Sequence, residues 1–128
     1  MRALLDTNSF LWFIAGSDRL SINARNIILD LNNDLFFSVA SLWEIAIKIS
    51  IGKLELLSSF EQLIRAQLEE NDISILPIEL NHVSGVIKLP FYHRDPFDRL
   101  IIAQGITEKL PVISSDASFG EYPIEVIW

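Results

Sequence analysis

Five short runs of apolar residues, separated by stretches with helical spacing, constrain the fold of this 128-residue chain most strongly. Each run is apolar at most positions and ends at a polar or turn-forming residue. This pattern is typical of strands that are buried on both faces of a parallel sheet. The runs cover residues 2–5, 35–38, 73–76, 111–114 and 124–128. They predict one α/β domain that spans residues 1–128.

Six segments between these runs have the apolar spacing of helices. Asp95 and Pro96 are typical of a helix start, because an Asp side chain caps free N–H groups and Pro suits the first helical position. Gly52 is a typical helix stop, and Gly105 indicates close packing against another segment. The expected helices cover residues 7–15, 20–31, 41–51, 58 or 59 to 71, 80–89 and 95–109. This order predicts a parallel sheet with helices on both faces.

Several large side chains are expected to lie in the core or on the surface according to their place in these helices. The helix at 41–51 is apolar around most of its circumference, so we expect it to be largely buried. Aromatic rings can stack on nucleic-acid bases, but core packing is the expected role of Trp12, Phe13, Trp43 and Phe97. We expect His82 to face solvent.

Composition excludes several classes of protein. The chain has 10 basic and 17 acidic residues and a formal charge of −7, which argues against gripping nucleic acid by bulk positive charge. The absence of cysteine excludes disulfides, thiolate zinc sites and Cys nucleophiles. No uncharged stretch reaches the roughly 18 residues of a membrane span, and no signal-peptide pattern is present. We therefore expect a cytoplasmic protein that does not enter a membrane.

Four carboxylates stand where a structural role alone explains them poorly. Asp6 ends the first expected strand, and Asp116 follows the fourth; ligands bind at this carboxyl end of parallel strands. Glu44 lies inside an apolar helix, where an unpaired charge would be destabilising by several kcal/mol. Asp98 lies in the first turn of the helix that starts at Asp95. We predict that the four share a site.

Each of the four also has a purely structural alternative. Asp6 can cap the helix that follows it, and Asp116 can be a turn residue. Glu44 can lie on an exposed stripe, and Asp98 can interact with the N-terminus of its own helix.

A shared site of carboxylates needs a cation, because four neighbouring negative charges repel one another. Mg²⁺ prefers oxygen ligands, and two such ions would balance the charge of four carboxylates. A chain with two histidines and no cysteine has few of the ligands that zinc or copper prefers. The acidic balance of the chain is therefore compatible with a nucleic-acid enzyme.

Four motifs in this order resemble the PIN-domain ribonucleases, and within them the VapC-type toxins of prokaryotic type II toxin–antitoxin systems. The motifs are LLDTN at 4–8, SLWEIAIK at 41–48, HRDPFDRLIIAQ at 93–104 and SSD at 114–116. The resemblance implies a three-layer α/β/α sandwich around a central, mostly parallel sheet of four to five strands. It also implies an endoribonuclease that depends on Mg²⁺, with Mn²⁺ as a possible substitute.

The resemblance assigns the catalytic and metal-binding tetrad to Asp6, Glu44, Asp98 and Asp116. It implies a homodimer and an antitoxin protein that blocks the site; part of the apolar run 11–14 is expected to form one of these two surfaces. Ser114 keeps a hydroxyl where relatives often have Thr, whereas Asn8 replaces a His that many relatives carry. We expect His93 at the rim of the cleft.

The resulting hypothesis is hydrolysis of the RNA phosphodiester by a water that the metal activates. In a supporting role, Thr7, Asn8 and Ser114 would orient carboxylates or waters. Arg94 or Arg99 would hold a phosphate, with an ion pair to Asp95 or a surface position as the alternative.

Other functions remain as alternatives at this point. A phosphoacceptor receiver domain has a similar length and acidity. It needs two acidic residues beside the first strand, an acceptor Asp after a middle strand and a Lys after the last-but-one strand, and this chain lacks all three features. Two alternatives stay within the resemblance: a PIN-type nuclease outside toxin–antitoxin biology, and an inactive module that binds RNA or protein.

Overall fold

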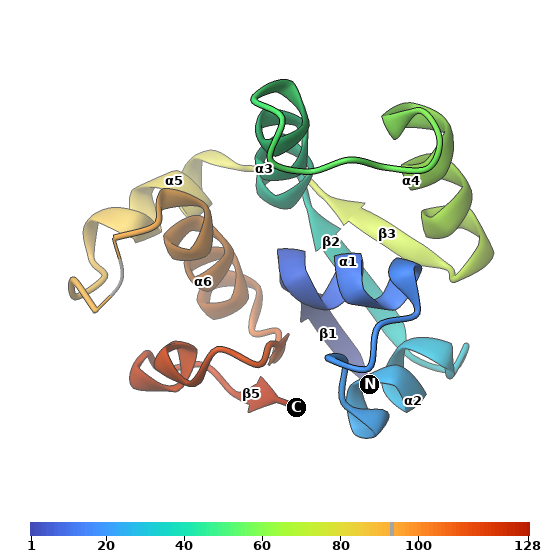
Figure 1. Ribbon diagram of the computed structural model, residues 1–128. Helices are drawn as coiled ribbons and strands as arrows, with labels where there is room; N and C mark the ends of the chain where they lie inside the picture. The colour runs from blue at the N-terminus through green and yellow to red at the C-terminus, as the bar shows by residue number, and fades with distance from the viewer. Residues whose placement is uncertain (93) are drawn as a thin grey trace.

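The computed structural model describes residues 1–92 and 94–128, and a five-stranded sheet lies at its centre (Figure 1). Every strand pair is parallel, and the order across the sheet is β3-β2-β1-β4-β5. The strands are β1 (Arg2–Leu5), β2 (Asp34–Ser38), β3 (Ile73–Leu76), β4 (Val112–Ile113) and β5 (Val126–Ile127). The predicted α/β class and number of strands are therefore confirmed.

Within residues 1–92 and 94–128, six α-helices and one short 3₁₀ helix connect the strands. They are α1 (Thr7–Ala15), α2 (Ile22–Leu29), α3 (Val39–Ser50), α4 (Phe60–Glu70), α5 (Leu80–Ile87), α6 (Pro96–Glu108) and η1 (Ala117–Glu121). None of the helices in the described parts of the chain has the length and apolar character that a membrane crossing requires.

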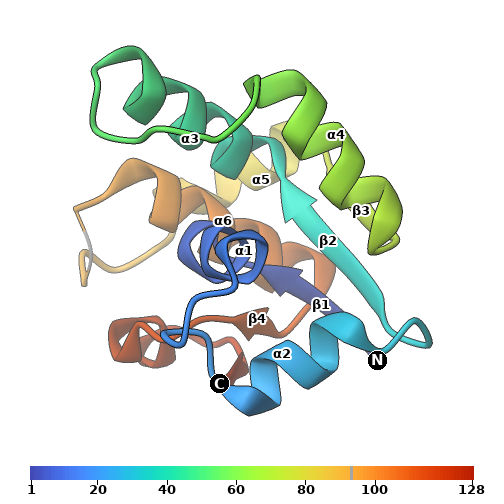
Figure 2. The same ribbon diagram turned by 45° about the vertical axis from the view of Figure 1, so that its right-hand side comes forward.

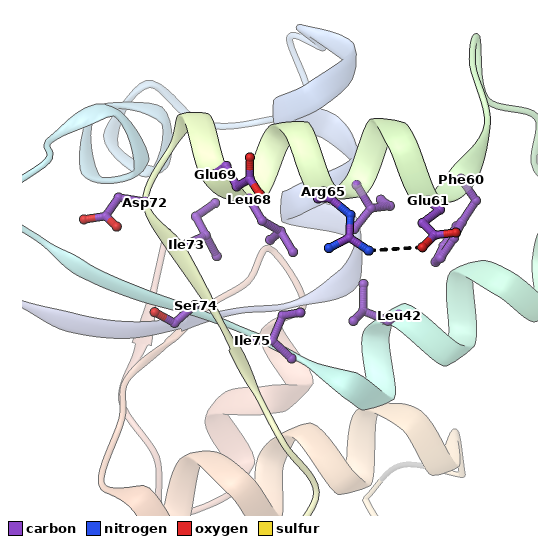
Figure 3. A pocket seen from close by; sticks show the side chains of 11 residues that line it. Leu42, Phe60, Glu61, Arg65, Leu68, Glu69, Asp72, Ile73, Ser74 and Ile75 are labelled. Atoms are coloured by element: carbon purple, nitrogen blue, oxygen red, sulfur yellow. Dashed lines mark hydrogen bonds and ion pairs between the residues drawn. The ribbon is translucent and has the colours of Figure 1, made fainter.

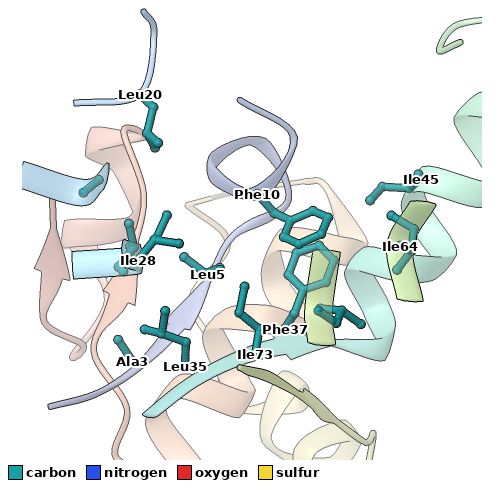
Figure 4. Packing of buried hydrophobic residues seen from close by; sticks show 13 residues of the cluster. Ala3, Leu5, Phe10, Leu20, Ile28, Leu35, Phe37, Ile45, Ile64 and Ile73 are labelled. Carbon is teal, nitrogen blue, oxygen red and sulfur yellow. The ribbon is translucent and has the colours of Figure 1, made fainter. Parts of the chain in front are cut away.

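Successive side chains of a strand are buried on opposite faces of the sheet, which explains why helices cover both faces. Ala3 and Leu5 are buried in one apolar cluster, whereas Leu4, between them, is buried in another. Neighbouring side chains of a strand point to opposite faces, so a strand that is apolar throughout needs cover on both. Figure 4 shows the first cluster, in which the rings of Phe10 and Phe37 stack.

The helices form two layers around the sheet (Figures 1 and 2). Helices α1, α2 and α4 contribute to the first cluster, and α5 and α6 pack on the second. Helix α3 contributes to both, through Ile45 to the first and Ala40 to the second. The predicted three-layer sandwich is thus observed.

The strand order reverses between β1 and β4. From β1 the chain continues to β2 and β3 on one side, and later to β4 and β5 on the other side. Loops leave such neighbouring strands in opposite directions, which opens a crevice beyond their carboxyl ends. The residues that follow β1 and β4 therefore border the position where an α/β protein is expected to bind a ligand.

Several boundaries differ from those expected. Helix α3 begins at Val39, immediately after β2, because the hydroxyl of Ser38 accepts a hydrogen bond from the Ala40 N–H and caps the helix. Helix α2 is shorter than predicted and leaves Ile22 and Leu31 exposed. Helix η1 was not expected.

Two predictions about burial were wrong. Trp43 is 59% exposed on α3, although Glu44 and Ile45 beside it are buried. His82 is fully buried, and its Nδ1 accepts a hydrogen bond from the Glu79 N–H at the start of α5. The imidazole thus takes the reciprocal capping role that Glu or Gln usually has at this helix position.

The two glycines of the α5–α6 pair are expected to respond oppositely to alanine. A Cβ on Gly105 would lie 3.1 Å from Val112 Cγ2 and 3.3 Å from the Leu110 carbonyl oxygen, whereas one on Gly85 would have ordinary contacts of 3.6 Å and more. Gly105→Ala should lower the free energy of unfolding by about 1 kcal/mol despite the better helix propensity of Ala. Gly85→Ala should raise it by up to about 1 kcal/mol. Urea unfolding measures the free energy of unfolding of both variants. Equal changes in the two variants would contradict the packing described.

Candidate active site at the carboxyl end of the sheet

Asp6 joins the end of β1 to the start of α1. Its carboxylate caps α1 by accepting a hydrogen bond of 2.8 Å from the Ser9 N–H, and its own N–H donates to the Ile113 carbonyl at the end of β4. The side chain is buried. Burial raises the pKa of Asp6 above its ordinary value, hydrogen bonds from Ser114 and Ser9 oppose this effect, and the charge of Asp116 adds to it.

Ser114 links the loops that follow the two central strands. Its buried hydroxyl hydrogen-bonds the Asp6 carboxylate and accepts the Asp116 N–H at 3.0 Å. One side chain therefore fixes both the carboxylate after β1 and the backbone after β4. This geometry gives a hydroxyl at position 114 a clear orienting role.

Glu44 reaches the same end of the sheet from α3. The Thr7 hydroxyl donates to Glu44 Oε1 at 2.6 Å and lies 2.8 Å from Ser41 Oγ. Lys48, one turn further along α3, forms an ion pair of 3.2 Å with Glu44 Oε2. Both oxygens of this buried carboxylate are thus paired, which explains how a charge is tolerated inside an apolar helix.

Asp98 is half-buried in the first turn of α6. Burial, followed by repulsion from Asp95, Glu44, Asp6 and Asp116, raises its pKa from 3.8 to about 7. All three other carboxylates of the expected tetrad therefore act on this one. Asp95 caps helix α6 by accepting hydrogen bonds from the Phe97 and Asp98 N–H groups. This cap fixes the start of the helix and so places Asp98 in its first turn.

Asp116 is exposed at the start of η1. Its carboxylate accepts hydrogen bonds from the backbone N–H and the hydroxyl of Ser118. In this arrangement it caps the 3₁₀ helix η1, whereas the structural alternative considered for it was a turn residue. Its charge nevertheless contributes to the raised pKa of both Asp6 and Asp98.

The four carboxylates are neighbours, but their oxygens are not arranged as a closed ligand set. Among residues 1–92 and 94–128, no three His, Asp or Glu side chains are placed so that they could hold a metal ion as they stand. Asp116 is turned to Ser118 and Glu44 to Lys48. The chemistry of the donors fits a hard divalent cation, since all are carboxylate oxygens whose mutual repulsion a cation would relieve. Binding would require side-chain rotation.

Hydrogen bonds between buried polar side chains attach α6 to the sheet, and the sequence analysis did not predict them. The Ser38 hydroxyl donates to Gln104 Oε1, and Gln104 Nε2 donates to the Pro77 carbonyl at 3.2 Å. These hydrogen bonds tie α6, which carries Asp98, to the ends of β2 and β3. A polar Gln inside the apolar run LIIAQG was the available signal, because a buried amide needs partners.

The two candidate phosphate-binding arginines differ in availability. Arg99 is buried, donates hydrogen bonds to the carbonyls of Val86, Leu89 and Pro90, and lies 4.1 Å from the ring centre of Phe91. It holds the loop before α6, and these contacts occupy its guanidinium, so a phosphate could be bound by Arg99 only in exchange for them. The role predicted for Arg99 stays a prediction. Arg94 is exposed, as is Asn8 in the first turn of α1. His93 lies outside the described residues.

Removing the Thr7 hydroxyl should disturb Glu44 while preserving the shape of the side chain. Thr7→Val leaves Glu44 Oε1 without its donor, so we expect a loss of about 1–2 kcal/mol of stability. If Glu44 contributes to the activity of the site, activity should fall about tenfold as well. Thr107→Val, the same change near the far end of α6, is the control. Equal effects of the two changes on both readouts would show that the Thr7 contact has no special role.

A hollow of about 670 Å³ lies between α4 and the edge strand β3 (Figure 3). Its floor is apolar and includes Leu68, Ile73 and Ile75, and the Arg65–Glu61 ion pair of 3.0 Å lies over it. None of the four carboxylates lines this hollow. The run at 11–14, expected to form a contact surface, is half-buried against the first core cluster.

Solved structures with the same fold are known. The chain resembles the structure of VapBC2 from Rickettsia felis bound to a DNA fragment from its promoter, with a TM-score of 0.75, 17% identity and coverage of 99% of this chain and 98% of that one. VapBC-1 from nontypeable Haemophilus influenzae has a TM-score of 0.68 and 20% identity, and the match covers 99% of this chain and 97% of that one. FitAcB from Neisseria gonorrhoeae has a TM-score of 0.66 and 19% identity, and the match covers 100% of this chain and 97% of that one.

The family assignment rests on the sequence match. No curated protein matches the chain. The PIN domain family matches residues 3–125, nearly the whole chain, and the solved structures share its fold. The match includes all four carboxylates at the end of the sheet. This chain therefore belongs to the PIN-domain family.

Proposed function

We propose that residues 1–128 form one endoribonuclease domain that hydrolyses RNA phosphodiester bonds and depends on Mg²⁺. The observation that carries this proposal is that Glu44, Asp6 and Asp116 all lie near Asp98, where their charges add to the effect of burial and of Asp95 in raising its pKa to about 7. Gathering negative charge in this way is destabilising without a counter-ion, so it is best explained by a function. PIN-domain proteins are nucleases that generally use divalent metal ions.

The tetrad would hold the cation through Asp6, Glu44, Asp98 and Asp116. Mg²⁺ fits a set of carboxylates better than softer metals do, and Mn²⁺ is an acceptable substitute. A bound cation of this kind supplies a Lewis acid that activates water and stabilises charge on the phosphate.

The residues around the tetrad have supporting roles in this proposal. Ser114 keeps the Asp6 carboxylate oriented, and Thr7 does the same for Glu44. Asn8 and Arg94, both exposed, are available to a water and to a substrate phosphate, respectively. Lys48 balances the charge of Glu44 until the carboxylate turns to another partner.

We further propose that the protein is the toxin of a toxin–antitoxin pair, acts in the cytoplasm and forms a homodimer. The fold likeness to VapBC and FitAcB supports this proposal. Two surfaces are suited to protein contacts. One is the hollow between α4 and β3, for the antitoxin. The other is the exposed apolar side of α5 formed by Leu80, Val83 and Ile87, for a second copy.

A cleavage assay tests the nuclease proposal. Purified protein is incubated with total RNA and with a DNA control, in Mg²⁺ and in EDTA. We expect endonucleolytic RNA fragments in Mg²⁺ and intact RNA in EDTA. Cleavage of DNA instead would favour a PIN-type nuclease outside toxin–antitoxin biology.

A second candidate is a PIN module that binds RNA or protein without cleaving it. The observation in its favour is that Glu44 and Asp116 are already paired with Lys48 and Ser118 rather than aimed at a common point. Intact RNA in the presence of Mg²⁺, together with measurable RNA binding, would favour this candidate.

A further inference from the structure

We propose that Trp43 is a stacking platform for an unpaired base beside the cleaved phosphodiester. This inference rests on the proposed ribonuclease function, and it adds a residue outside the four carboxylates that positions the substrate.

The exposure of Trp43 is the first observation. Its side chain is 59% exposed, although Glu44 and Ile45, the next two residues of α3, are buried. A Trp side chain carries a large apolar surface, so leaving most of it in water is unfavourable. The exposed indole is therefore available for a contact with another molecule.

The position of Trp43 is the second observation. Its ring lies 5.2 Å, centre to centre, from that of Phe97 on α6, at an angle of 81° between the planes. Trp43 directly precedes Glu44, and Phe97 directly precedes Asp98. The aromatic pair thus joins α3 to the first turn of α6, the two helices that carry Glu44 and Asp98.

The perpendicular geometry leaves the indole usable as a platform. In an edge-to-face pair, Phe97 can cover at most one face of the Trp43 ring. Since the side chain is 59% exposed, we infer that another part of the indole surface is available to a flat group. Because α3 and α6 are each fixed by buried contacts, the platform is rigid with respect to the carboxylates. A base stacked there would hold its neighbouring phosphate near the tetrad.

The negative charge of the protein explains why RNA binding would need an uncharged contact. The chain carries a formal charge of −7, and the site itself gathers four carboxylates, so phosphates are not attracted by the protein as a whole. Base–aromatic stacking is independent of charge and accepts any base. It requires, however, that the base be free of its partner, because a paired and stacked base cannot leave the helix without an energetic penalty.

The test measures RNA binding separately from cleavage, in the Asp98→Asn background so that the RNA stays intact. The probes are a fluorescein-labelled oligoadenylate strand and the same strand annealed to its complement, followed by anisotropy. Trp43→Ala should weaken binding of the single strand about 5- to 100-fold and change duplex binding little. Trp43→Phe should lie between Trp43→Ala and the parent.

Leu31→Ala is the matched control. Leu31 is 68% exposed, comparable to Trp43, but it lies in the turn before β2, at the opposite end of the sheet from the carboxylates. It should leave binding unchanged. In the otherwise unaltered enzyme, Trp43→Ala should raise KM for single-stranded RNA by a similar factor and leave kcat within a few-fold.

Equal affinities of the parent and Trp43→Ala for the single strand would overturn the inference, and so would equal losses for single strand and duplex. A change in molar mass by light scattering on Trp43→Ala would also overturn it, because the indole would then serve a contact between copies. Absence of cleavage by the unaltered protein, with Trp43-dependent binding of the single strand retained, would remove the nuclease proposal but support the stacking role.

Discussion

Asp98→Asn is expected to lower the rate of RNA cleavage at least about a hundredfold, while the protein remains folded. The substitution keeps the size and polarity of the side chain but removes a charge that a divalent cation would bind. It also removes the group on which Asp6, Glu44 and Asp116 converge electrostatically. Initial rates on a defined RNA, in saturating Mg²⁺, measure the effect.

Asp95→Asn is the matched control for this prediction. Asp95 lies three residues earlier, in the same helix start, and caps α6 through the Phe97 and Asp98 N–H groups. Asn also caps helices well, so the change removes a neighbouring charge without unfolding the turn. Its rate should stay within a few-fold of the unaltered protein. If Asp98→Asn were equally mild, Asp98 would have no place in the reaction.

The same substitution should stabilise the metal-free protein at high pH. The folded protein holds Asp98 with a pKa of about 7, against 3.8 ordinarily, so between these pH values the folded state binds a proton that the unfolded state has lost. The contribution of this group to stability is therefore largest at low pH and is lost as the pH rises through 7. Since Asp98 is only half-buried, we expect the unaltered protein to lose on the order of 1–2 kcal/mol in free energy of unfolding as the pH rises.

Urea unfolding in EDTA at pH 8 and at pH 4 measures this effect. The free energy of unfolding of Asp98→Asn should exceed that of the unaltered protein by about 1–2 kcal/mol at pH 8. Near pH 4 the two free energies should be equal. Adding Mg²⁺ at pH 8 should stabilise the unaltered protein and leave the variant nearly unchanged. Glu70→Gln, which removes an exposed charge on α4, should show neither effect. A variant less stable than the unaltered protein at pH 8 would contradict the repulsion described here.

Local signals made much of this fold predictable from the sequence. Asp95 and Pro96 mark the start of α6 because capping depends only on neighbouring residues. Asp6 and Asp116 could be placed at one end of the sheet because parallel strands share a direction. The order β3-β2-β1-β4-β5 was not predictable, since the apolar pattern of a strand does not name its neighbours.

The errors and omissions concern residues whose surroundings come from distant segments. The apolar character of the helix at 41–51 predicted burial for Trp43, but the side chain is 59% exposed. Arg99 was considered for phosphate binding because it follows Asp98, and the sequence did not indicate that the carbonyls of Val86 in α5 and of Leu89 and Pro90 after it bind this side chain. His82 is buried by the α5–α6 contact, which no local pattern encodes.

The central claim is that one divalent cation site unites the four carboxylates at the carboxyl end of β1 and β4. The most direct measurement is an anomalous difference map from a crystal of the protein soaked in Mn²⁺. We predict a peak enclosed by Asp6, Glu44, Asp98 and Asp116, with Asp116 turned from Ser118 toward the ion. A map without a peak there, with Asp116 still on Ser118 and Glu44 still on Lys48, would contradict the claim.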